Sequence, residues 1–243
     1  MAGLMPHEEK SLKTKRSILD ATEELLADGG LEAVTVRGVC ERAGAAYGSF
    51  YHHFGSKERV VAACCERQFE ACMQSNPCPS EIAEGDYIAR CLWYGLVFGA
   101  FCEGLGRGVV RYLYLNGPGA NGLFPELFTA GLFPAVGEGL AAGFVRTHFF
   151  GADDTEKVVG NIKKDLRITC VGVVLWWCCL PEDEREETLA DTLEHHIFHQ
   201  LIHTVSDAYH EAGFPRALLT QRGLDKKVRM SALGTTGRKE ENQ

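Results

Sequence analysis

Residues 35–57 read TVRGVCERAGAAYGSFYHHFGSK, and this stretch decides the fold of the N-terminal part of the chain. Its first third has apolar residues at the spacing of a short helix, with Thr35 placed as the N-cap and Gly44 as the terminator. A second short helix is predicted from about Tyr47 to Phe54. A helix, a tight turn that contains glycine and a second helix form the outline of a helix-turn-helix motif.

The second helix of this motif concentrates side chains that can reach phosphates and base edges, and it contains no acid. These residues are Tyr47, Gly48, Ser49, Tyr51, His52 and His53. The pattern predicts a DNA-recognition helix. Periodicity alone leaves an alternative open, in which Phe50 and Phe54 are core residues and the polar residues only face solvent.

The same stretch resembles the DNA-binding domain of the TetR (tetracycline repressor) family of bacterial transcription regulators. The likeness lies in Thr-Val-Arg, Ala-Gly and Gly-Ser-Phe-Tyr-His-His-Phe-Gly-Ser-Lys-Glu, within roughly residues 13–61. Two positions depart from the usual pattern, since Ala46 stands where a small hydroxyl residue commonly caps the recognition helix and Gly38 where a helix former is usual. The resemblance implies phosphate contacts from Arg37, Tyr47, Tyr51, His52 and Lys57, and close approach to base edges at Gly48 and Ser49.

The fold that the resemblance and the helical spacing predict is all-α. We expect a three-helix helix-turn-helix domain over residues 1–56, a helical effector-binding and dimerisation domain over 57–213, and a disordered tail over 214–243. The body is expected to contain helices over about 86–103, 123–145, 154–179 and 183–212, and no stretch alternates as a strand does. Its 123–145 helix carries several glycines and prolines, so we expect it to be kinked or mobile.

The resemblance further implies a homodimeric repressor that binds a palindromic double-stranded DNA operator and is released by a small-molecule effector. The last two long helices would pack against those of the partner. Aromatic residues are numerous in the body, and together they suggest a mostly apolar effector pocket. The alternative is that these rings simply pack against one another. The candidates are Trp93, Phe98, Phe101, Tyr112, Phe124, Phe128, Phe133, Phe144, Trp176 and Trp177.

Two other kinds of sensor remain open. His195, His199 and His203 are spaced i, i+4 and i+8 on one helical face, where imidazoles can bind a metal such as zinc. Ten cysteines, among them the adjacent pairs at 64–65 and 178–179, could report oxidation if their thiols were exposed and of low pKa. At apolar helical positions, cysteine more often behaves as a small hydrophobic residue.

Composition excludes several classes of protein. The net charge of −8 predicts modest non-specific DNA affinity, although residues 35–59 carry more basic than acidic residues. The first residues lack an apolar signal core, so we expect a cytoplasmic protein with reduced thiols. The glycine-rich run at 104–108 lacks nucleotide-binding spacing, and no nucleophile elbow is present. We therefore expect neither catalysis nor a cofactor.

Overall fold

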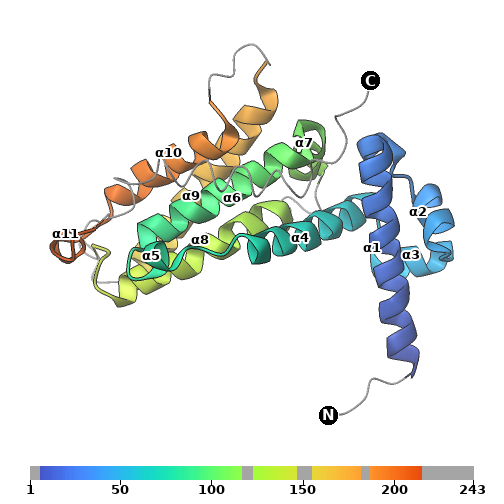
Figure 1. Cartoon of the computed structure of the whole chain (residues 1–243), viewed down its shortest axis with the longest axis horizontal. Coiled ribbons are helices and arrows are strands. Elements are labelled where there is room, and N and C mark those ends of the chain that lie inside the picture. The colour runs from blue at the N-terminus through green and yellow to red at the C-terminus, as the bar shows by residue number, and fades with distance from the viewer. Residues whose placement is uncertain (1–5, 117–122, 147–154, 182–186, 215–243) are drawn as a thin grey trace. The chain divides into compact units, whose positions relative to one another are not determined.

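The computed structural model describes residues 6–116, 123–146, 155–181 and 187–214, and these residues fold as helices (Figure 1). Within the described ranges, the β-structure consists of one isolated antiparallel bridge between Val145 and Val205. The predicted all-α fold is therefore confirmed. The helices are α1 (Pro6–Ala33), α2 (Val36–Ala43), α3 (Tyr47–His53), α4 (Lys57–Ser75), α5 (Ser80–Ala83), α6 (Tyr87–Leu105), α7 (Arg107–Asn116), α8 (Leu123–Ala141), α9 (Thr155–Cys179), α10 (Leu189–Ile202) and α11 (Asp207–Glu211).

Contacts group the chain into two compact units, which we call the head unit and the body unit. The head unit contains residues 1–68 and 111–124, and the body unit contains 69–110 and 125–243. Helix α4 therefore contributes residues to both units. The predicted domain limits at 56 and 213 remain predictions, and the tail beyond 214 lies outside the described residues.

The helix-turn-helix has the caps that its sequence predicts. Thr35 is extended (φ −121°, ψ 149°), and its hydroxyl accepts a 3.0 Å hydrogen bond from the amide of Gly38. Gly44 ends α2 in the left-handed region at φ 60°, where glycine bears no steric penalty. Ala46 is the N-cap residue of α3 and provides no side-chain hydrogen bond. This is expected, because alanine stands there in place of the usual hydroxyl residue. The phenyl rings of Phe50 and Phe54 are buried beneath α3.

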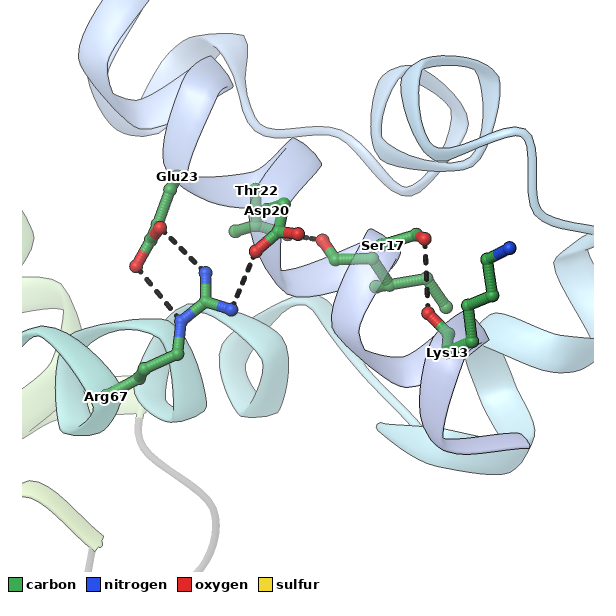
Figure 2. Close-up of polar contacts among 7 residues, drawn as sticks. Lys13, Ser17, Asp20, Thr22, Glu23 and Arg67 are labelled. Carbon is green, nitrogen blue, oxygen red and sulfur yellow. Dashed lines mark hydrogen bonds and ion pairs between the residues drawn. The ribbon is translucent and has the colours of Figure 1, made fainter. Parts of the chain in front are cut away.

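Helix α1 supports these two helices and is joined to α4 by ion pairs (Figure 2). It loses helical geometry at Gly29 and Gly30, and Gly30 takes a positive φ of 64°, which glycine adopts without steric penalty. In Arg67 of α4, Nη1 donates to Oδ1 of Asp20 at 2.8 Å, and Nε donates to Oε1 of Glu23 at 3.2 Å. Nη2 lies 2.7 Å from Oε2 of Glu23 as an ion pair, without hydrogen-bond geometry. The guanidinium of Arg67 thus binds two carboxylates that lie one turn apart on α1.

We expect Arg67→Met to lower the free energy of unfolding by about 1 kcal/mol, the upper range for ion pairs that water partly screens. The side chain of Arg67 is 31% exposed and that of Asp20 is 52% exposed, so screening limits the loss. Arg59→Met is the matched control, because Arg59 is exposed on the same helix. Urea unfolding of both variants checks the prediction, and an equal loss in both would contradict it.

The core of the body unit is the packing of α6 against α10, and two glycines on one face of α6 make it possible. A Cβ atom at Gly99 would lie 2.5 Å from the Cα of Ala190, and one at Gly95 would lie 2.6 Å from Cδ1 of Ile197. The bare backbone of α6 therefore lets α10 approach closely. Nearly all of α6 is buried, from Tyr87 to Cys102.

Helix α8 runs from Leu123 to Ala141 with Pro134 inside it. Its glycines make room for aromatic rings of α6. A Cβ atom at Gly131 would lie 1.9 Å from the ring of Tyr94, and one at Gly139 would lie 2.5 Å from the ring of Tyr87. At these two positions the glycines therefore allow close packing, and the expected kink stays a prediction.

The last helix ends earlier than its apolar spacing predicts. A single helix over 183–212 was expected, but α10 ends at Ile202 and α11 begins at Asp207. Between them the chain pairs with residues from the end of α8, since the amide of Arg146 donates to the carbonyl of Thr204 and the amide of Ser206 to that of Phe144, both at 2.8 Å. This long-range pairing replaces the helical hydrogen bonds.

Helix α6 is the one described helix that is long and apolar enough to cross a membrane. Of its most apolar window, 78% is buried inside the structure. Such burial is typical of a core helix.

Candidate nucleic-acid interface

Helix α3 presents one exposed face, and the predicted recognition residues lie on it. Tyr47 is 50% exposed and Tyr51 is 54% exposed, although large aromatic side chains are usually buried. Gly48 and His52 are also exposed, and Ser49 is half-buried. The ring of Tyr51 packs edge-on against Phe50 with centroids 5.5 Å apart, so the core orients it. The face therefore exposes hydroxyl and imidazole groups of the kinds that contact phosphates and base edges.

Arg37, which is also predicted to contact a phosphate, lies on α2, and its side chain is 78% exposed. Its Nε donates to Oε1 of Glu41 at 2.7 Å. The hydrogen bond to Glu41 raises the pKa of the guanidinium, which is charged at any physiological pH. Arg37 can meet a phosphate only with its remaining donors or by leaving Glu41.

The amine of Lys57 is held at the start of α4. It donates to the carbonyl of Leu31 at 3.0 Å and lies 5.7 Å from the ring centroid of Tyr112. An ammonium group has three donors, so two remain for a phosphate. The Leu31 contact has no signal in the sequence, because a backbone carbonyl carries no residue signature.

Tyr112 was predicted to line the effector pocket, but it belongs to the head unit. Its hydroxyl donates to Oε1 of Glu58 at 2.8 Å. Burial and this bond raise the pKa of the phenol, whereas hydrogen bonds from Ser56, from the backbone and from Tyr112 lower the pKa of Glu58. Tyr112 thus orders the first turn of α4 beside Lys57, and its assignment to an effector pocket stays a prediction.

Gly48 offers a test that separates DNA binding from folding. No atom lies within 4 Å of where its Cβ would be, so the fold leaves room for a side chain. We expect Gly48→Ala to keep or raise stability, since alanine favours helices by up to about 1 kcal/mol. The added methyl group occupies the face that approaches base edges, so operator affinity should fall about tenfold, as for one lost contact of about 1.4 kcal/mol. Thermal unfolding and a salt-controlled shift assay would measure the two effects, and unchanged affinity would contradict the assignment.

The predicted pocket aromatics are mostly accounted for by packing. Trp93, Phe98, Phe101 and Trp177 are buried, and the ring of Phe69 contacts those of Phe98 and Phe101 at centroid distances of 5.4 and 5.1 Å. Trp176 is 54% exposed on α9, and its place in an effector pocket stays a prediction. Phe133 is half-buried beside Lys163 and Arg167, and Phe144 packs on Tyr209. The side chains of Phe124 and Phe128 lie outside the described residues.

A cavity of about 190 Å³ does occur in the body unit, at a place that the sequence did not indicate. It is lined by Arg146, Val158, Ile162, Asp165, His199, Gln200, His203 and Thr204. None of the predicted aromatic residues is among them. The set joins residues up to 58 positions apart, from Arg146 to Thr204, and no periodic pattern in the sequence connects them.

The geometry gives little support to a metal site at the histidines or to redox sensing by the cysteines. His195 and His199 lie close, with ring centroids 4.4 Å apart, but within the described ranges no three His, Cys, Asp or Glu side chains are placed to hold a metal ion. Most of the cysteines are buried. Burial raises the pKa of Cys65 and Cys91 to about 12 and that of Cys78 to about 11, which makes these thiols less reactive.

Comparison with known proteins identifies the head. Residues 18–64 match the model of the bacterial regulatory proteins of the tetR family. The chain is 45% identical over 56 residues to the HTH-type transcriptional repressor KstR of Rhodococcus jostii, which is 23% of this chain and 26% of that repressor. The match thus spans about a quarter of the relative's length.

Two solved structures extend the likeness of fold to the body. Thermus thermophilus FadR, a repressor in complex with lauroyl-CoA, superposes with a TM-score of 0.58 at 15% identity, over 77% of this chain and 93% of FadR. TylP from Streptomyces fradiae superposes with a TM-score of 0.53 at 18% identity, over 94% of this chain and all of TylP. At such identities the likeness concerns the fold alone. The head, over residues 18–64, is thus similar to the tetR family of bacterial regulatory proteins, and the chain shares the all-helical fold of these two structures.

Proposed function

We propose that the protein is a ligand-responsive transcriptional repressor that binds a palindromic operator as a homodimer. The observation that carries the proposal is the exposed face of α3, where Tyr47 and Tyr51 stand in solvent one helical turn apart. The buried rings of Phe50 and Phe54 fix that face. Each recognition helix would lie in a major groove, with the two half-sites about 34–36 Å apart or a multiple of that distance.

Dimerisation is supported by an exposed apolar stripe on α9. Ile168 is 60% exposed, and Trp176 lies two turns further along the same face, with Gly172 between them. Exposed apolar side chains that form a continuous patch usually mark an interface. We assign this stripe, together with the neighbouring face of α10, to contact with the same helices of a second copy.

The effector that we propose is a small, mostly apolar molecule bound in the body. The FadR structure, which holds lauroyl-CoA, supports a ligand in a body of this fold. Binding releases DNA only if the effector prefers the conformation with lower DNA affinity, and couplings of this kind are typically about 1–3 kcal/mol. A metal or an oxidant as the signal has no specific observation in its favour.

Selection of bound duplexes from random DNA tests the proposal. The full-length protein should enrich a palindrome with evenly spaced half-sites, and analytical ultracentrifugation should show a dimer on that duplex. A compound library is then screened for release of the enriched duplex. If no sequence is enriched, the proposal of a DNA-binding regulator is refuted. If a site is enriched but no compound releases it, only the proposal of a small-molecule effector is refuted.

A further inference from the structure

The 190 Å³ cavity described above lies between the first half of α9 and the end of α10, which pack side by side in the body unit (Figure 1). Val158 and Ile162, both buried, come from α9. His199 and His203 come from α10 and its C-cap, and Arg146 comes from the segment after α8. Asp165 is about 10 Å along α9 from Gly172, at the centre of the proposed dimer stripe, at about 1.5 Å per residue.

Basic groups outnumber acids in the lining. Arg146 is always charged, and its side chain is 45% exposed. The nearest carboxylate that pairs with it is Asp207, at 3.6 Å, which is longer than the roughly 2.7–2.9 Å of a charge-assisted hydrogen bond. The guanidinium therefore keeps donors for another acceptor. The backbone at Arg146 is held beside the cavity, because its amide donates to the carbonyl of Thr204.

The remaining lining restricts what could bind. The volume lies below the roughly 300–1,000 Å³ of sites for drug-sized ligands. Val158 and Ile162 offer an apolar wall to a short hydrocarbon chain. Asp165, the one acid of the lining, repels any anion, and it repels one with two negative charges more strongly than one with a single charge. A metal ion is disfavoured, because no suitable group of three ligands exists in the described part of the chain.

We propose that this cavity binds a small monocarboxylate. The guanidinium of Arg146 and the imidazole of His203 hold the carboxylate, and the alkyl chain lies against Val158 and Ile162. Gln200 and Thr204 add an amide and a hydroxyl to the polar side of the lining. The site goes beyond the proposed function, since binding here requires neither DNA nor the apolar effector.

Calorimetric titration of the full-length protein without DNA tests the site, with hexanoate as the probe. Hexanamide has the same shape without the charge, and adipate adds a second carboxylate. We expect hexanoate to bind and each of the other two to bind at least about tenfold more weakly, as the loss of one charged hydrogen bond predicts. Because no operator is present, failure here leaves the regulator proposal untouched.

Two variants complete the experiment. Arg146→Gln should weaken hexanoate binding by about tenfold or more, since a charged donor is removed. Lys164→Gln removes a positive charge from an exposed position of α9 outside the lining and should leave binding unchanged. Circular dichroism confirms that both variants are folded. No binding of hexanoate, equal binding of hexanamide, or equal loss in both variants would overturn the site.

Discussion

Tyr51→Ala should abolish specific operator binding while the head stays folded and the protein stays dimeric. The side chain is 54% exposed, so its removal takes little from the core, and Phe50 and Phe54 remain buried beneath α3. A dimer loses the contact twice. At about 1–3 kcal/mol for each contact the total is about 2–6 kcal/mol, a loss of at least about thirtyfold in affinity.

Fluorescence anisotropy with the selected duplex at fixed salt would measure this loss. Leu115→Ala is the control, because Leu115 is 62% exposed in the same unit but lies on α7. Tyr51→Phe separates the hydroxyl from the ring, and an intermediate affinity would assign the phosphate contact to the hydroxyl. Operator affinity in Tyr51→Ala equal to that of Leu115→Ala would remove Tyr51 from the interface.

Gly99→Ala should strongly destabilise the body unit, although it adds a single methyl group. The new Cβ would lie 2.5 Å from the Cα and 2.7 Å from the amide nitrogen of Ala190, and real Cβ atoms do not approach backbone so closely. Helix α10 would have to move as a whole. Overpacking of this kind costs about 1–3 kcal/mol and occasionally more.

Two glycine variants serve as controls in the same denaturation assay. At Gly95 the obstacle is Cδ1 of Ile197, the end of a side chain that can change rotamer, so Gly95→Ala should lose less stability than Gly99→Ala. Gly160→Ala on α9 meets nothing within 4 Å and should gain up to about 1 kcal/mol from helix propensity. If Gly99→Ala were as stable as Gly160→Ala, the close approach of α6 and α10 would be refuted.

The local signals in the sequence predicted the head well. Thr35 and Gly44 act through neighbours three or four residues away, so their roles as caps follow from spacing alone. The end of α10 could not be predicted in this way, because it depends on pairing between Val145 and Val205, which are far apart in the sequence. The packing role of the glycines on α8 could not be predicted for a related reason. The cost of a glycine in helix propensity is local, whereas its benefit depends on which ring of α6 faces it.

The candidate interface also contains features that local spacing predicts and features that depend on distant contacts. The motif placed Tyr47, Tyr51 and His52 on an exposed face, and the structure has them there. It could not predict that Lys57 would bond to the carbonyl of Leu31 or that Tyr112 would reach Glu58. Counting aromatic residues in the body did not distinguish a pocket from a packed core, because both need the same composition.

The uncapped start of α3 has a consequence for how the recognition helix is held. Ala46 has no hydroxyl to offer, and the first amides that bond back to its carbonyl are those of Ser49 and Phe50. The amides of Tyr47 and Gly48 come before them, at the end of the helix where the peptide dipoles favour an anion. Within the helix these two amides have no acceptor, so the start of α3 depends on its packing on the buried rings of Phe50 and Phe54.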